Sequence, residues 1–115
     1  MEQPFRFIDL CVLYAALHFV GDFAFQSAWM AMEKGKNKEV LLYHCLTYTA
    51  PFALAIVLLG RLSNYHPNIL SVLIIFLSHI AIDTCSARLK VIKTVWGDQL
   101  WHLSVLGGLL GVGWL

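Results

Sequence analysis

Four apolar stretches, each long enough to cross a lipid bilayer as a helix, constrain this chain more than any other feature. They cover about residues 5–32, 38–59, 68–89 and 94–115. A membrane-spanning helix needs about 20 residues, because each residue adds 1.5 Å and the hydrocarbon core is ~30 Å thick. Of the 115 residues, 59% are hydrophobic and 13% are charged, about half the charged share of a soluble domain. We therefore predict an all-α membrane protein, with residues 1–115 forming one domain, a bundle of four transmembrane helices.

The basic residues are distributed unevenly between the two sides of such a bundle. Six of the eight lysines and arginines lie at the first and third connections: Lys34, Lys36, Lys38, Arg88, Lys90 and Lys93. The other side has only Arg6 and Arg61. Because basic loops stay in the cytoplasm, we predict a multi-pass protein of the inner (cytoplasmic) membrane with both termini outside.

The remaining composition argues against two other classes of protein. No basic patch is interleaved with aromatic residues, so nucleic-acid binding has little support. The three cysteines are odd in number and lack C-x-x-C spacing, which argues against a disulfide framework. Cys45 and Cys85 lie near polar residues and could be soft metal ligands, although small buried hydrophobic side chains are the favoured interpretation.

Three times a histidine and an aspartate stand four residues apart within an apolar stretch. The pairs are His18/Asp22, His79/Asp83 and Asp98/His102. Four residues is about one helical turn, so each pair shares a helix face. Ionisable groups in hydrocarbon cost several kcal/mol unless they find partners. Counted from the basic ends, the carboxylates lie ~6–8 Å and the outer imidazoles ~12–14 Å inside the membrane, with His44 at a similar depth. We therefore predict one shared polar site.

The mixture of imidazole and carboxylate is typical of metal sites in helix bundles. The predicted ligands are His18, Asp22, His44, His79, Asp83, Asp98 and His102. Such a set suits zinc, manganese or iron better than magnesium, and it could activate a water molecule. Among Asp22, Asp83 and Asp98, some would ligate and one would act as general base. A metal-free network of histidines and aspartates that holds the helices together is equally compatible with the sequence.

Further residues have weaker interpretations. Gln26, Lys34 and Gln99 flank the polar layer and could hold an anionic group of a substrate, although solvation is the favoured role for Lys34. Gly107 and Gly111 form a G-x-x-x-G motif in the last apolar stretch, a spacing that permits close helix approach and so indicates a homo-oligomer through this helix.

The string from His18 to Gln26, with Gly21, Asp22 and Phe23 between them, resembles an H-x-x-G-D-F-x-x-Q signature. This signature belongs to a family of small bacterial and phage membrane proteins, catalogued as a domain of unknown function, number 3307. The later positions that resemble its pattern are Lys34, His44, His79, Asp83, Lys90, Asp98, Gln99 and His102. The resemblance implies a compact multi-helix protein of the inner membrane. It supports one shared site but supplies no substrate.

Three functions follow from these observations. We favour a metal-dependent membrane enzyme, a hydrolase working at the cytoplasmic leaflet. The first alternative is an oligomeric transporter or channel coupled to protons or cations; against it, the second and fourth stretches have almost no polar residues in the outer leaflet. The second alternative is a non-catalytic membrane protein that binds a partner, in which the polar network is structural.

Overall fold

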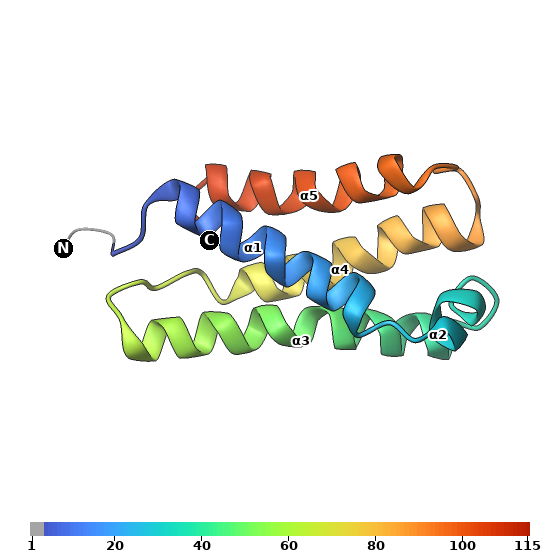
Figure 1. The fold of residues 1–115 in the computed structure, drawn as a ribbon, viewed down its shortest axis with the longest axis horizontal. Coiled ribbons are helices and arrows are strands. Elements are labelled where there is room, and N and C mark those ends of the chain that lie inside the picture. Colours follow the sequence, from blue (N-terminus) through green and yellow to red (C-terminus); the bar gives the residue numbers. More distant parts are fainter. Residues whose placement is uncertain (1–3) are drawn as a thin grey trace.

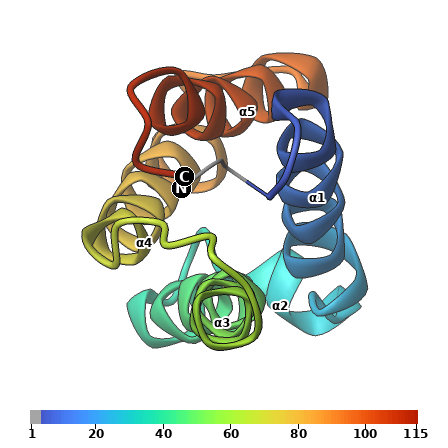
Figure 2. The same ribbon diagram turned by 90° about the vertical axis from the view of Figure 1, so that its left-hand side faces the viewer.

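The computed structural model describes residues 4–115, and in this part of the chain all regular structure is helical. The elements are α1 (Phe7–Phe19), the π-helical η1 (Val20–Ala24), α2 (Ala28–Glu33), α3 (Lys38–Leu62), α4 (Leu70–Asp83), the π-helical η2 (Thr84–Arg88) and α5 (Val95–Gly111). The four long helices run along a common axis in Figure 1. Figure 2 shows them around one centre, in the order α1, α3, α4 and α5, with each helix against the next.

Three helical segments are long and apolar enough to cross a membrane: Phe7–Ala24, Lys38–Leu62 and Leu70–Arg88. Their outward faces carry large exposed hydrophobic side chains such as Val12, Leu54 and Leu73, as a lipid-facing surface requires. The prediction of an all-α chain is therefore confirmed for the described residues, and three of its helical segments are compatible with a membrane. The last helix, α5, has 17 residues and lies at the short end of the spanning range.

The first predicted helix, over residues 5–32, is wrong as one continuous element. The α-helix ends at Phe19, a π-helical turn follows, and a separate short helix begins at Ala28. Ser27 starts this helix, because its side-chain oxygen accepts a hydrogen bond of 3.1 Å from the backbone N–H of Met30. The break turns the chain back toward α3, so the residues after it lie beside that helix (Figure 1).

Gly21 allows η1 to approach α3 closely. A Cβ atom at this position would lie 2.8 Å from the backbone oxygen of Tyr48, closer than real Cβ atoms come. The close approach brings the next residue, Asp22, into the interior. The second π-helical segment begins directly after Asp83, so each of the two deeply buried aspartates adjoins a π turn. Such turns occur often at functional sites.

The two ends of the bundle are held by different contacts. At one end, the first connection lies against the start of the third. Gly35 is so close to Ala87 that a Cβ at Gly35 would collide with the backbone oxygen of Ala87. Both basic connections therefore share an end, at the right of Figure 1. At the other end, the backbone N–H of Asn68 donates to the carbonyl of Trp114 at 2.7 Å. The first and third connections thus lie at one end of the bundle and the second at the other, as predicted from the sequence.

The end away from the basic connections is filled mainly by apolar side chains. This core includes Leu10, Phe52, Ile56, Ile75 and Leu106. Its polar contact is a hydrogen bond of 3.0 Å between the hydroxyl groups of Tyr14 and Tyr65. The buried ionisable side chains gather at the opposite end.

Candidate metal centre

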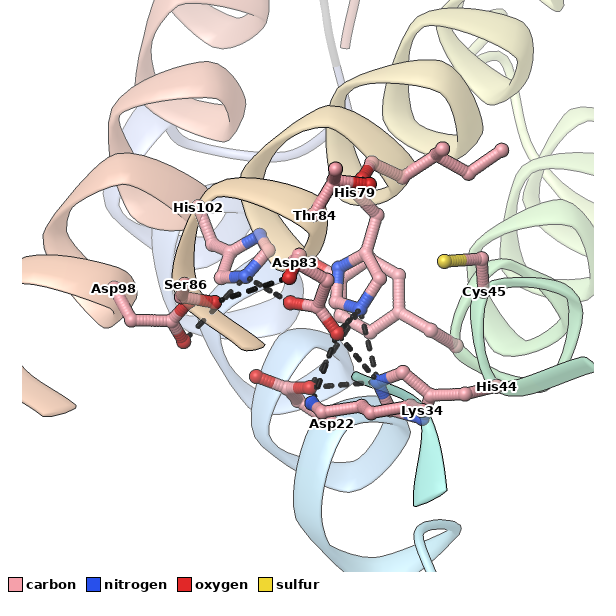
Figure 3. Close-up of polar contacts among 12 residues, drawn as sticks. Asp22, Lys34, His44, Cys45, His79, Asp83, Thr84, Ser86, Asp98 and His102 are labelled. Carbon is pink, nitrogen blue, oxygen red and sulfur yellow. Dashed lines mark hydrogen bonds and ion pairs between the residues drawn. The ribbon is translucent and has the colours of Figure 1, made fainter. Parts of the chain in front are cut away.

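Four ionisable side chains from three helical segments converge in the interior. Asp22 comes from η1, His44 from α3, and His79 and Asp83 from α4. Figure 3 shows these four side chains pointing toward one another. Their exposed fractions are 3% for Asp22, 0% for both histidines and 1% for Asp83. The predicted shared site is therefore present for these four residues.

The distances within this group suit a single bound cation. His44 Nε2 lies 3.0 Å from His79 Nε2, and 3.2 Å from both Asp22 Oδ1 and Asp83 Oδ2. His79 Nε2 lies 3.6 Å from Asp22 Oδ1 and 3.4 Å from Asp83 Oδ2. Ligands 2.0–2.1 Å from a tetrahedral zinc ion are separated by about 3.3–3.4 Å. The observed separations scatter around this value, so one small cation at the centre could contact all four atoms.

Stacking orients the imidazole of His79, and neither histidine of the first group has a hydrogen bond at Nδ1. The His79 ring stacks on Tyr48, with centroids 3.7 Å apart, and on His102, at 4.3 Å. The Nδ1 atoms of His44 and His79 are buried and have no hydrogen-bond partner among residues 4–115. Metal-bound histidines usually donate this second N–H to an acceptor, whereas the His79 ring is held by stacking.

A second, adjoining group is formed by Asp22, Asp98 and His102, whose ligand atoms also lie within 4.8 Å of one another. His102 and Asp98 both come from α5. His102 Nε2 lies 3.2 Å from Asp83 Oδ1 and 3.6 Å from Asp98 Oδ2. Asp83 therefore lies between the two groups, with His102 on one side and His44 and His79 on the other (Figure 3).

His18 lies outside both ligand groups because its two ring nitrogens are already hydrogen-bonded. Nδ1 lies 2.7 Å from the Tyr48 hydroxyl, and Nε2 lies 2.6 Å from Oε1 of Gln99. An amide oxygen only accepts, so Nε2 carries the hydrogen and Nδ1 accepts from Tyr48. The Gln99 amide nitrogen in turn donates to Asp22 Oδ2 at 3.0 Å and Asp98 Oδ2 at 2.9 Å. The sequence predicted His18 as a metal ligand. In the structure its ring nitrogens contact Tyr48 and Gln99, and it belongs to neither ligand group.

The three residues predicted to bind substrate lie in different surroundings. Lys34 reaches into the centre, where its Nζ donates to Asp83 Oδ2 at 2.9 Å and its side chain is 14% exposed, so the favoured interpretation of a solvated lysine is wrong. Gln99 is engaged with His18 and the two aspartates. Gln26 is half-buried, and its Oε1 has no partner within the described part of the chain.

A cavity of ≈ 270 Å³ adjoins the centre on the side of the basic connections. Asp98 and Gln99 lie on its wall together with Lys93 and Thr94 from the third connection. Of the three predicted catalytic carboxylates, Asp98 is the one that lines this cavity, and its side chain is 17% exposed. Asp98 is therefore the residue through which this cavity borders the candidate ligand groups.

The cysteines lie apart from both ligand groups. Cys11, Cys45 and Cys85 are free cysteines in the structure. Cys45 is buried and follows His44 in the sequence, whereas Cys85 is half-buried. Neither cysteine belongs to a ligand group. The favoured interpretation of small buried side chains thus agrees with the position of Cys45.

The fold and the site define a helical protein with membrane-compatible helices and a buried His/Asp cluster able to hold a metal ion. The chain belongs to the family described as "Protein of unknown function (DUF3307)", whose model matches residues 10–110. This match confirms the family resemblance and includes every residue of both ligand groups. No curated protein and no solved structure matches the chain.

Proposed function

We propose that this protein is a metal-dependent membrane enzyme, a hydrolase that works at the cytoplasmic leaflet. The observation that carries the proposal is the set of separations of 3.0–3.6 Å among the four buried ligand atoms. A purely structural network would need only paired contacts, one histidine to one carboxylate. Here each of the two imidazole nitrogens faces the other and both carboxylates.

Charge supports a cation at this place. Asp22, Asp83 and Asp98 meet one lysine, Lys34, so two negative charges stay unbalanced while the imidazoles are neutral. Unbalanced charges in a membrane interior are costly. Binding of divalent cations would offset this negative charge. Two imidazoles with two carboxylates favour zinc, manganese or iron over magnesium, which prefers oxygen ligands and keeps its waters.

The side chains around the centre suit hydrolysis. A bound cation would lower the pKa of a water molecule toward 7 and so provide a nucleophile at neutral pH. Lys34 holds Asp83 in place, and Gln99 holds Asp22 and Asp98. Asp98 lies on the cavity wall, on the side from which a substrate would approach. The general base is one of the three aspartates, as predicted from the sequence.

The membrane arrangement that we propose has four spans, with α5 as the last. The six basic residues of the first and third connections then face the cytoplasm, and both termini lie outside. The cavity beside Asp98 lies at the basic end, so it would open to the cytoplasmic leaflet. Lys93 on its wall would favour a substrate with an anionic group.

Transport is the less favoured function. A path for ions through the bundle would need polar groups along its full length. The half away from the site is filled by buried apolar side chains, among them Leu10, Phe52, Ile75 and Leu106. The polar site at one end fits a reaction at one leaflet better.

The test is hydrolysis by the full-length protein purified in detergent, with and without added Zn²⁺ or Mn²⁺. The probes are p-nitrophenyl acetate, p-nitrophenyl phosphate and bis(p-nitrophenyl) phosphate. We expect turnover of at least one probe that depends on the metal, is lost in Asp83→Asn and is kept in His66→Ala. His66 is an exposed histidine in the connection at the opposite end. Metal binding without turnover of any probe would argue against a hydrolase.

A further inference from the structure

We propose that the centre holds two divalent cations, with the carboxylates of Asp22 and Asp83 bridging them. This inference rests on the proposed function for its first cation, which lies among Asp22, His44, His79 and Asp83. The second cation would lie in the adjoining group, among Asp22, Asp98, His102 and the free side of Asp83.

The two oxygens of Asp83 face different sets of partners. Oδ2 lies 3.2 Å from His44 Nε2 and 3.4 Å from His79 Nε2, which belong to the first group. Oδ1 lies 3.2 Å from His102 Nε2, which belongs to the second. A carboxylate that bridges two cations has ligands of a different cation beside each oxygen, and Asp83 is placed in this way.

The two oxygens of Asp22 also face different partners. Oδ1 faces His44 and His79, at 3.2 and 3.6 Å. Oδ2 is held by the amide of Gln99, which also holds Asp98 Oδ2. This shared donor sets the two carboxylates side by side. Asp22 is accordingly a member of both ligand groups.

The ligands of the second group have the separations and the free acceptors that a cation requires. His102 Nε2 lies 3.2 Å from Asp83 Oδ1 and 3.6 Å from Asp98 Oδ2, the same range as in the first group. Oδ1 of Asp98 is buried and has no hydrogen-bond partner among residues 4–115. A buried carboxylate oxygen without a donor is costly, and a cation would satisfy it.

A two-cation centre would also deepen the proposed chemistry. In hydrolytic two-metal sites the ions lie about 3.5–4 Å apart and clamp both the attacking and the leaving oxygen. Here the second group lies on the cavity side, because Asp98 lines the cavity. A substrate that entered through the cavity would meet the second cation first.

The experiment is titration of the metal-free, full-length protein in detergent with Mn²⁺, read by equilibrium dialysis and by electron paramagnetic resonance. We expect two Mn²⁺ per chain and the broadened spectrum of two magnetically coupled ions. In His102→Ala, and independently in Asp98→Asn, we expect one Mn²⁺ per chain with the six-line spectrum of an isolated ion. The control His66→Ala should keep two coupled ions.

The outcomes separate this inference from the proposed function. One Mn²⁺ per wild-type chain with an isolated spectrum would overturn the two-cation centre and leave the first site standing. No bound Mn²⁺ in the folded wild-type protein would overturn both. Two uncoupled ions, with no change in His102→Ala and Asp98→Asn, would also overturn the bridged arrangement.

Discussion

His18 Nε2 lies 2.6 Å from Gln99 Oε1, which connects α1 to α5 at the edge of the candidate metal centre. This contact fixes the orientation of the Gln99 amide, because its oxygen is bound to His18 and only its nitrogen can then face the carboxylates. The amide nitrogen donates to Asp22 and Asp98. Tyr48 completes the chain by donating to the other nitrogen of His18. Three residues outside the two ligand groups thus set the position of two candidate ligands, Asp22 and Asp98.

Gln99→Met should weaken metal binding without abolishing it. The substitution keeps the length of the side chain but removes both the acceptor for His18 and the donor to the two aspartates. Loss of such an outer contact typically costs 10–100-fold in metal affinity. Competition between the purified protein and a calibrated zinc chelator measures this change. Unchanged affinity, or a loss as complete as in His79→Ala, would contradict the positioning role, and His66→Ala is the matched control.

Gly21→Ala should destabilise the fold by about 1–3 kcal/mol, because overpacking at a close contact forces the backbones apart. The new Cβ would lie 2.8 Å from the Tyr48 backbone oxygen and 3.1 Å from its ring. We also expect weaker metal binding, since Asp22 is the next residue. Thermal unfolding in detergent measures the stability. Gly108→Ala is the control: a Cβ there meets nothing within 4 Å, so this variant should be as stable as the wild type or slightly more stable.

The topology predicts which side of the membrane each connection faces. With Cys11, Cys45 and Cys85 replaced by alanine, a single cysteine at Lys36 should react with a membrane-impermeant maleimide only after the cytoplasmic side is opened. A cysteine at Asn64, in the connection at the other end, should react in intact spheroplasts. The reverse labelling pattern would place the candidate site at the outer leaflet and contradict the proposed function.

Gly107 and Gly111 should form a contact between two copies of the chain. Both are exposed on α5, and a Cβ at either position meets no atom of the same chain within 4 Å. Small residues at this spacing let two helices approach closely in a membrane. We expect Gly107→Ile combined with Gly111→Ile to shift the protein from dimer to monomer in multi-angle light scattering. An unchanged mass would show that this surface faces lipid alone.

The sequence was sufficient to predict most members of the two candidate ligand groups, because the regular turn of an α-helix sets the direction of each side chain. His79 and Asp83 are four residues apart in α4, and their facing atoms lie 3.4 Å apart. The same spacing brings His102 Nε2 within 3.6 Å of Asp98 Oδ2 in α5. His44 has no aspartate four residues away in its own helix. It was predicted as a ligand because its expected depth in the membrane matches that of the His/Asp pairs.

The spacing rule did not give the position of His18 relative to Asp22, because the chain between them changes its helix type. The α-helix ends at Phe19 and Asp22 lies in a π turn, which holds more residues per turn than an α-helix. The two side chains therefore do not stack on one face. Asp22 faces the ligand group, whereas His18 faces Tyr48 and Gln99. Gly21, which permits the close approach to α3, was the one residue in this segment that could have indicated the change.

The role of Lys34 depends on a break that hydropathy does not reveal. A continuous helix to residue 32 would carry Lys34 past the end of the bundle and into solvent. The turn before Ser27 and the short helix α2 instead fold the chain back, so that Lys34 reaches Asp83. Serine is a typical N-cap residue, and Ser27 caps α2 through the backbone N–H of Met30. Because Ser27 lies within a strongly apolar stretch, the hydropathy pattern did not indicate a helix start there.

The central claim is that aspartates and histidines from separate helices hold a metal ion. X-ray absorption at the zinc edge of the zinc-loaded, detergent-purified protein tests this claim most directly. We predict nitrogen and oxygen ligands at about 2.0–2.1 Å, with the outer-shell scattering of imidazole, and loss of this signal in His44→Ala combined with His79→Ala. Failure of the folded protein to retain zinc, or a sulfur ligand at about 2.3 Å, as expected if Cys45 bound the metal, would contradict it.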